Sequence, residues 1–460
     1  MKRVAIIGGG LAGLAAGCAL AEAGVTVIVF ERRPYVGGRA SSYEHPGTGE
    51  VIDNCQHVLL GCCTNLIHFY ERLDVSGKIR WFDELTFIEP GGRASRLRPS
   101  FLPAPLHAAP SFLKAKYLSL TDKLAIARAF ARLLGDLPED SNENFLEWLQ
   151  RQGQTRNAVE RLWKPVLVSA LNEDLDRVSV HYAAQVFRES FLKSAAAGRM
   201  GLPTIPLSQL YSSAIEYIRS HGGQVNLRTA VTSIRPGSDG VMLTVNSDEQ
   251  RFDAAVLAVP FQAAASLLPT DASSESLKRE LEHFEPSPIT GIHLWFDREV
   301  TALPHAVLLD RTIQWMFQKS KFQEPGYREG NGSYMELVVS ASKSLVQKSR
   351  EEVLELALKE LAEFFPSVRD AKVVKAAVIK EVYATYSVLP GLDQYRPEAK
   401  TPWPRLFLAG DWTATKWPAT MEGAVRSGYL AAEAVTDAAG ERRKFLVADL
   451  PARGLMKMFD

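Results

Sequence analysis

Blocks of apolar and polar positions along the chain predict a mixed α/β protein. Short apolar runs at 4–7 and 25–30 flank a helix-length stretch of small and apolar residues at 11–23. Strand, glycine-rich turn, helix and strand in this order predict a βαβ unit. The same character returns at 207–262, and again at 405–435, where an apolar strand precedes a helix of small residues.

Two segments between these blocks have other patterns. Residues 121–204 carry apolar side chains at helical spacing, whereas 99–118 contain four prolines and cannot form one long helix. Residues 285–389 alternate strand-like pieces with one amphipathic helix at 349–365, which predicts an antiparallel sheet with a helix.

The predicted fold class is therefore α/β, with a Rossmann-like dinucleotide-binding domain interrupted by insertions. We assign 1–80, 205–284 and 390–440 to the discontinuous binding domain. The insertions are a substrate-binding sheet domain (81–98 and 285–389) and a helical subdomain (99–204), and a tail (441–460) follows. A chain of 460 residues is long enough for two or three domains.

The first βαβ unit carries the G-x-G-x-x-G fingerprint at its turn. Gly8 permits the tight turn, Gly10 lets a pyrophosphate approach the backbone, and Gly13 allows close packing of helix on sheet. The helix N-terminus favours an anion. Glu31 closes the second strand, 18 residues after Gly13, close to the spacing of about 20 for an acid that binds ribose hydroxyls.

A second glycine-rich turn, Gly37-Gly38-Arg39, follows. Its guanidinium could pair with a phosphate, or Arg39 could be solvated on a surface loop. The whole run GGGLAGLAAGCALAEAGVTVIVFERRPYVGGRA resembles the amino-terminal signature of the flavin amine oxidase and phytoene desaturase superfamily. The resemblance implies FAD, with Glu31 on the adenosine ribose, Gly38 and Arg39 beside the flavin and its pyrophosphate, and backbone near Val231 against adenine.

The 405–435 element resembles the second flavin motif of that superfamily. Asp411 follows the predicted strand, where its carboxylate suits ribityl hydroxyls or a phosphate, and the helix from Met421 would direct its N-terminus at the flavin. Trp417 either frames the flavin face or packs in the core. The predicted cofactor-binding residues are Gly8, Gly10, Leu11, Ala12, Gly13, Glu31, Arg32, Gly37, Gly38, Arg39, Val231, Gly410, Asp411, Trp417, Thr420, Met421 and Ala424.

Residues 50–63 pack Asp53, Asn54, Gln56 and His57 between apolar side chains. Such a segment is either a hydrogen-bonded turn or an active-site wall beside the flavin. DNCQHVLLGC, with WPATMEGAVRSG further on, resembles the squalene-associated branch of the superfamily, the hydroxysqualene dehydroxylases.

That resemblance implies reduction of hydroxysqualene, a C30 allylic alcohol, to squalene in bacterial squalene or hopanoid synthesis. A general acid protonates the hydroxyl, water leaves, and the allylic cation receives a hydride from reduced flavin, which an unidentified reductant must regenerate. Asp53 and His57, with Glu422 behind them, are the candidate proton donors, and the sequence does not choose among them.

Three other functions fit the same fold. A polyprenyl or carotenoid desaturase would withdraw hydride instead. An amine oxidase typically carries a lysine on the strand aligned with PITGIHLWF, where this chain has Gly291. Prenyl-group carriers related to guanine nucleotide dissociation inhibitors do not use flavin, but they usually lack the second motif.

Composition narrows the classes of partner that the protein is expected to bind. Basic and acidic residues balance at 53 each, without a polybasic block, which disfavours nucleic acid. Four cysteines without metal-ligand spacing predict no metal site and a reducing cytoplasm. The apolar residues of 99–118 either pack on the helices or form a membrane-dipping rim for a lipid substrate. The basic, apolar tail is either a packed terminus or a peripheral membrane anchor.

Overall fold

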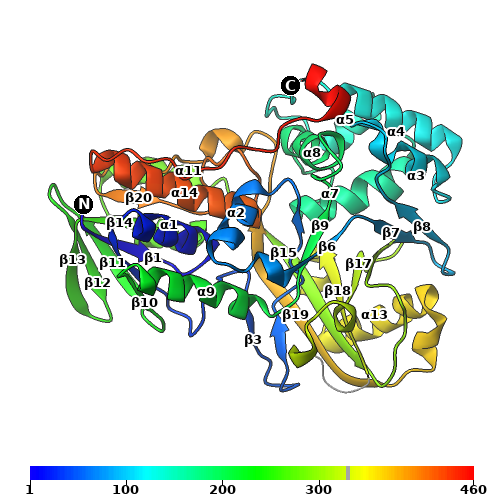
Figure 1. Cartoon of the computed structure of the whole chain (residues 1–460), viewed down its shortest axis with the longest axis horizontal. Helices are drawn as coiled ribbons and strands as arrows, with labels where there is room; N and C mark the ends of the chain where they lie inside the picture. The colour runs from blue at the N-terminus through cyan, green and yellow to red at the C-terminus, as the bar shows by residue number, and fades with distance from the viewer. Residues whose placement is uncertain (328–331, 460) are drawn as a thin grey trace.

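The computed structural model describes residues 1–327 and 332–459, so 328–331 of the predicted sheet domain and residue 460 of the tail lie outside the described residues. Figure 1 shows a β-sheet with helices around the N-terminus, and a second sheet with a group of helices beside it at the other end. This mixed architecture confirms the α/β fold class.

The N-terminal sheet is parallel, with the order β10-β2-β1-β14-β20. It therefore joins three distant parts of the sequence. Its strands are β1 (Arg3–Ile7), β2 (Thr26–Phe30), β10 (Gln224–Asn226), β14 (Ala254–Leu257) and β20 (Leu406–Leu408).

Both faces of this sheet are buried, which explains its near-continuous apolar strands. Val4 and Ile6 pack toward the helices on one face, and Ala5 and Ile7 toward a small antiparallel sheet on the other. The covering elements are α1 (Leu11–Glu22), α9 (Leu207–Ser220), α14 (Met421–Ala438), β11 (Val231–Pro236), β12 (Val241–Val245) and β13 (Asp248–Phe252).

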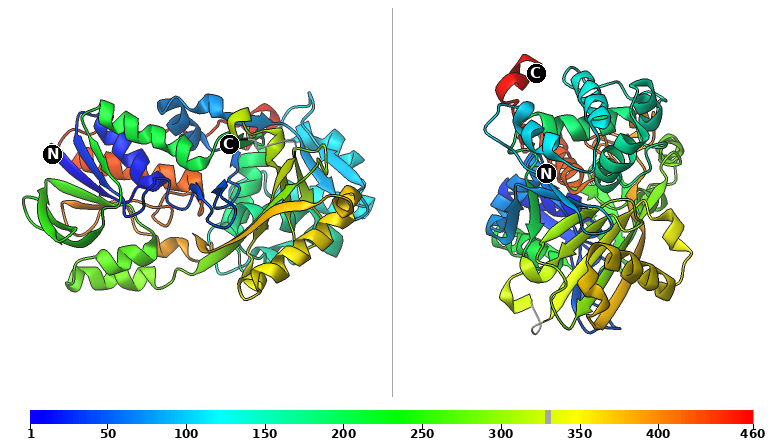
Figure 2. Two further views of the ribbon diagram at one scale, coloured as in Figure 1. Left: turned by 90° about the horizontal axis from the view of Figure 1, so that it is seen from below. Right: turned by 90° about the vertical axis from the view of Figure 1, so that its right-hand side faces the viewer.

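The second large sheet has seven strands in the order β19-β15-β18-β17-β16-β7-β8, antiparallel except where β16 meets β7. Helices α12 (Lys343–Val346) and α13 (Arg350–Phe364) belong to the same inserted segment, and α13 covers one face of the sheet (Figure 2). The strands are β7 (Leu85–Ile88), β8 (Ala94–Leu97), β15 (Pro286–Phe296), β16 (His305–Leu308), β17 (Trp315–Gln318), β18 (Ser333–Ser340) and β19 (Val373–Tyr386).

The helical group lies beside the other face of this sheet. Two of its segments, η3 and η4, are π-helical, a form found often at functional sites. Its members are α3 (Ala109–Lys114), α4 (Leu120–Arg132), α5 (Phe145–Arg151), α6 (Arg156–Ala158), η3 (Val159–Trp163), α7 (Lys164–Leu171), α8 (Val180–Phe187) and η4 (Arg188–Leu192).

Short elements connect these layers. They are β3 (Ser42–Glu44), β4 (Val51–Asp53), β5 (Leu59–Leu60), α2 (Thr64–Arg72), β6 (Ile79–Phe82), β9 (Met200–Pro203), α10 (Phe261–Leu267), α11 (Ala272–Leu281) and the 3₁₀ turns η1 (Ser76–Lys78), η2 (Leu106–Ala108), η5 (Lys319–Lys321), η6 (Pro325–Tyr327), η7 (Pro366–Arg369), η8 (Asp393–Tyr395) and η9 (Gly454–Met458). Among the described residues, no helix combines the length and apolarity needed to cross a bilayer.

The two segments that the sequence left open are both packed in part. In the proline-rich segment Leu102 and Phe112 are half-buried, while Phe101, Leu106 and Leu113 are exposed. The tail runs back along the helical group, where Ala452 and Met456 are buried in the core. The tail is therefore packed in part, while Leu455, Met458 and Phe459 near its end are exposed.

Candidate active site

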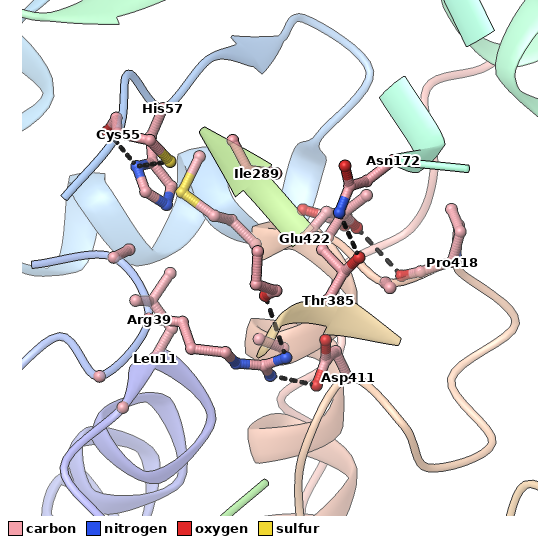
Figure 3. Close-up of a pocket in the computed structure, with 18 of the residues that line it drawn as sticks. Leu11, Arg39, Cys55, His57, Asn172, Ile289, Thr385, Asp411, Pro418 and Glu422 are labelled. Atoms are coloured by element: carbon pink, nitrogen blue, oxygen red, sulfur yellow. Dashed lines mark hydrogen bonds and ion pairs between the residues drawn. The ribbon is translucent and has the colours of Figure 1, made fainter. Parts of the chain in front are cut away.

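One cavity of about 920 Å³ extends from the glycine-rich turns to the space between the seven-stranded sheet and the helical group. Its wall includes residues of both glycine-rich turns, of 54–63, of α7, α8 and η4, of the sheet, and of 410–424. Figure 3 shows the part of this wall where the N-terminal and C-terminal motifs meet.

The sheet contributes alternate residues to the wall. Ile289, Val307, Phe317 and Val338 line the cavity, whereas their neighbours along each strand, such as Leu337, pack under α13. This is the period of two expected for a sheet with both faces buried. The inserted domain thus supplies an apolar surface that continues from the nucleotide-binding end.

The nucleotide-binding end fits a dinucleotide. No side chain caps the N-terminus of α1, so its first amides are available to a ligand anion. A Cβ added at Gly10 would stand in open space, with its nearest neighbour 3.9 Å away at Gly38. The Glu31 carboxylate is held by the amides of Gly9 (2.7 Å) and Arg33 (2.8 Å), which fixes it at the end of β2.

The second glycine-rich turn meets the C-terminal motif directly. Arg39 donates to the Asp411 carboxylate at 2.5 Å, across 372 positions of sequence (Figure 3). Its guanidinium also reaches the Ala384 carbonyl at 3.4 Å. Arg39 is therefore partly exposed but paired across the site, and the two ends of the chain close one site.

All but one of the predicted cofactor-binding residues line this cavity. The exception is Gly13, whose added Cβ would lie 2.0 Å from the Gly8 carbonyl oxygen, so Gly13 serves the packing of α1 on the sheet. The lining residues are Gly8, Gly10, Leu11, Ala12, Glu31, Arg32, Gly37, Gly38, Arg39, Val231, Gly410, Asp411, Trp417, Thr420, Met421 and Ala424.

Asp53, a predicted proton donor, is not among the residues that line the cavity. Its buried carboxylate accepts hydrogen bonds from Lys319 (2.6 Å), Ser42 (2.6 Å) and the Leu207 amide (3.1 Å). Burial alone would raise its pKa, but the Lys319 charge and the hydrogen bonds from Lys319, Ser42 and Leu207 together outweigh burial and lower the pKa of Asp53. An ionised carboxylate behind the wall does not face a substrate in the cavity, so the structure disfavours Asp53 as the proton donor.

Lys319 is the centre of a buried ionic cluster with Asp53, Glu336 and Gln56. Its ammonium lies 3.0 Å from the Gln56 side-chain oxygen and 3.2 Å from Glu336. Burial alone would lower the pKa of Lys319. The Asp53 and Glu336 carboxylates raise this pKa by more than burial lowers it, so the lysine stays charged. With two acids and one cation, burial and the Asp53 charge raise the pKa of Glu336 to about 7, despite Lys319.

Glu336 should therefore make stability depend on pH. Its native pKa of about 7 exceeds its ordinary value of 4.5, so the native state binds more protons than the unfolded state between these values. The stabilisation is complete below pH 4.5 and is lost as pH rises through 7. Urea unfolding at pH 5 and at pH 8 gives the difference in free energy of unfolding between Glu336→Gln and the native protein. This difference should shift in favour of the variant from pH 5 to pH 8. An equal difference at both values would contradict this.

Glu422, the third predicted donor, belongs to the wall, but its carboxylate is saturated. From the first turn of α14 it accepts hydrogen bonds from the amides of Asn65 (3.1 Å) and Leu66 (2.7 Å) and from Arg426 (2.8 Å). Because these amides open α2, Glu422 caps that helix from another element. Its observed role is structural.

His57 is the one predicted donor on the cavity wall whose ring can exchange a proton there (Figure 3). Its Nδ1 donates to the Cys55 carbonyl at 2.8 Å, which leaves the lone pair of the neutral ring at Nε2. Burial lowers the pKa of His57 below its ordinary 6.5, although the Cys55 and Arg39 carbonyls oppose this. The ring is therefore neutral at pH 7.

Sequence reasoning missed Asn172, which also lines the cavity. In left-handed conformation (φ 54°) it ends α7, and its amide donates to the Ser287 carbonyl (3.1 Å) and the Thr385 hydroxyl (2.9 Å). It accepts from the Ala341 amide at 2.6 Å, so one side chain joins the helical group to the sheet. An asparagine at a helix end was the available signal.

Gly291 lies beneath the 54–57 segment, where an added Cβ would be 3.4 Å from the Asn54 carbonyl oxygen. Ile289, two positions earlier on the same strand, lines the cavity instead. No lysine is among the described residues that line it. The lysine expected for amine oxidation therefore has no counterpart at this wall.

Comparison with known proteins agrees with this geometry. Residues 11–436 match the family described as flavin containing amine oxidoreductase. The chain is 28% identical over 458 residues to a 15-cis-phytoene desaturase from Synechococcus elongatus (94% of this chain, 95% of the relative), and 27% identical over 477 residues to a zeta-carotene desaturase from Synechocystis sp. (94% and 97%).

Solved structures show the same fold at greater sequence distance. A Methanosarcina mazei oxidoreductase superposes with a TM-score of 0.73 at 18% identity, covering 95% of this chain and 100% of that one. The chain thus belongs to the flavin-containing amine oxidoreductase family, and it is an FAD-dependent oxidoreductase.

Proposed function

We propose that this protein converts hydroxysqualene to squalene by reductive dehydroxylation. The observation that carries this is one continuous cavity in which the FAD-binding motifs lead into an apolar space with an imidazole on its wall. Bound FAD supplies the hydride when reduced. The C–O bond breaks, a C–H bond forms, the oxygen leaves as water, and an external reductant supplies the two electrons.

The protein would contribute orientation, exclusion of water and one proton. Apolar residues of the sheet and of α7, α8 and η4 would hold the polyprenyl chain and shield an allylic cation from water. The imidazolium form of His57, a minor form at pH 7 because burial lowers its pKa, would give its proton to the departing hydroxyl. Asp53, Lys319 and Glu336 would keep this wall in place, because Gln56, the neighbour of His57, is tied to Lys319.

A second candidate is polyprenyl desaturation, which the phytoene and zeta-carotene desaturase relatives favour. There, hydride leaves the substrate and neutral His57 would accept the proton. The two reactions differ in substrate and redox partner. Product mass from hydroxysqualene with dithionite, compared with phytoene and a quinone oxidant, separates them: squalene from the first incubation supports dehydroxylation, and a product two hydrogens lighter from the second alone supports desaturation.

The pH profile of the His57→Gln protein tests the role of this residue. If His57 donates the proton, kcat of the native enzyme should fall as pH rises above its depressed pKa, since less imidazolium remains. The variant should retain FAD absorbance, lose about 10²- to 10⁴-fold in kcat and show no such pH dependence. A native profile that rises with pH would indicate a base, and an unchanged variant would remove His57 from the reaction.

A further inference from the structure

Exposed large apolar side chains gather at one end of the molecule. Among the described residues, eight of the twelve such side chains lie in two segments, 101–124 and 455–459. Phe101 is 96% exposed and Met458 78% exposed, which is extreme for these residue types. Exposure of this kind, concentrated in one region, marks a contact surface.

The two segments meet in space although more than 300 positions separate them in sequence. The Leu455 amide donates to the Ala104 carbonyl at 2.8 Å, and Gly454 packs against Pro103 and Ala104. Figure 1 places the C-terminal segment beside the helical group, next to α5 and α8. We call the exposed side chains of 101–124 and 455–459 the apolar end surface.

The charges in the sequence around this surface are mostly basic. Residues 99–132 contain five basic side chains against one acid, and 450–460 contain two basic side chains against one acid, Asp460, in a chain of zero net charge. The first of these acids, Asp122, is buried and serves the N-terminus of α4 through Ser119. Lys114, Lys116 and Lys457 are exposed beside the apolar residues. Apolar side chains ringed by cations fit an anionic bilayer surface.

The surface is also close to the cavity. Tyr117, at the end of the proline-rich segment, stacks on Phe87 with ring centroids 5.2 Å apart, and Phe87 lines the cavity. One aromatic layer separates the segment from the cavity wall. A protein resting on a bilayer through this end would hold its apolar cavity beside the membrane.

We propose that the apolar end surface docks on the anionic headgroup and acyl boundary of a lipid bilayer. Phe101, Leu113 and Met458 enter the boundary, and Lys114, Lys116 and Lys457 pair with lipid phosphates. Leu120 and Leu124 lie four positions apart on α4, so they share one side of the helix. Burial of this side in the bilayer extends the contact. This contact depends on no particular substrate and needs no membrane-spanning helix.

Flotation of the FAD-loaded full chain with vesicles tests this directly. With vesicles of phosphatidylcholine and 30% phosphatidylglycerol, most protein should float. Binding should fall at least tenfold for pure phosphatidylcholine, for 0.5 M salt, and for the Phe101→Ser/Leu113→Ser/Met458→Ser protein. The matched control, Val374→Ser/Val382→Ser, changes exposed residues of β19 elsewhere and should bind like the native chain.

FAD absorbance and melting temperature establish that each variant is folded. Equal vesicle binding by the triple variant and the native chain would overturn the proposal, as would absence of native binding to both vesicle types. A dimer in sedimentation that the triple variant abolishes, without vesicle binding, would show instead that a second copy covers this surface.

Discussion

Replacing Gly10 with valine should give a folded protein that purifies without FAD. The turn itself leaves space for the first carbon of the new side chain, because the nearest atom to an added Cβ is 3.9 Å away. The side chain would fill the space where the pyrophosphate must approach the turn. FAD affinity should fall at least about 100-fold, while the melting temperature of the cofactor-free protein changes little.

Flavin absorbance of the purified protein and titration with FAD measure this effect. Gly77→Val is the matched control, since Gly77 is exposed and an added Cβ there also meets nothing within 4 Å. That control should keep its FAD. A Gly10→Val protein that carries FAD like the control would contradict the assignment of the pyrophosphate site.

Replacing Lys319 with methionine should destabilise the protein by about 3–5 kcal/mol, because it leaves the Asp53 and Glu336 carboxylates buried without a cation. The matched control is Lys78→Met, which breaks an ion pair with Glu324 whose side chains are 45% and 38% exposed. That change should cost less than about 1 kcal/mol.

Urea unfolding with an assay of flavin release measures both variants. Adding Asp53→Asn and Glu336→Gln to Lys319→Met removes the unpaired charges and should recover part of the loss. If the free energy of unfolding of Lys319→Met lies within about 1 kcal/mol of the native value, the buried cluster does not hold the cavity wall.

The cofactor site could be predicted from sequence because local patterns determine it. The turn glycines, Glu31 and the helix from Met421 each act through backbone geometry within a few residues, and the structure places all of them except Gly13 at one end of a cavity. Arg39 pairs with Asp411 because the fold brings two such motifs together, although neither sequence segment by itself indicates this pairing.

The proton donors could not be chosen from sequence because their state depends on distant partners. Asp53 and His57 lie four positions apart in sequence. Lys319 pairs with Asp53 behind the wall and keeps it ionised, whereas burial keeps His57 uncharged on the wall. Lys319 stands in an ordinary polar run after β17, without any pattern that indicates burial. Glu422 looked catalytic beside the flavin motif, but its partners are amides of a helix more than 350 positions earlier.

The most direct test of the proposed reaction is a single turnover without oxygen. Protein containing reduced FAD is mixed with one equivalent of hydroxysqualene, and flavin absorbance and product mass are followed together. We predict that flavin re-oxidises as one squalene forms per FAD, with a non-exchangeable hydrogen that comes from the reduced flavin. Flavin that stays reduced while hydroxysqualene remains intact would contradict reductive dehydroxylation.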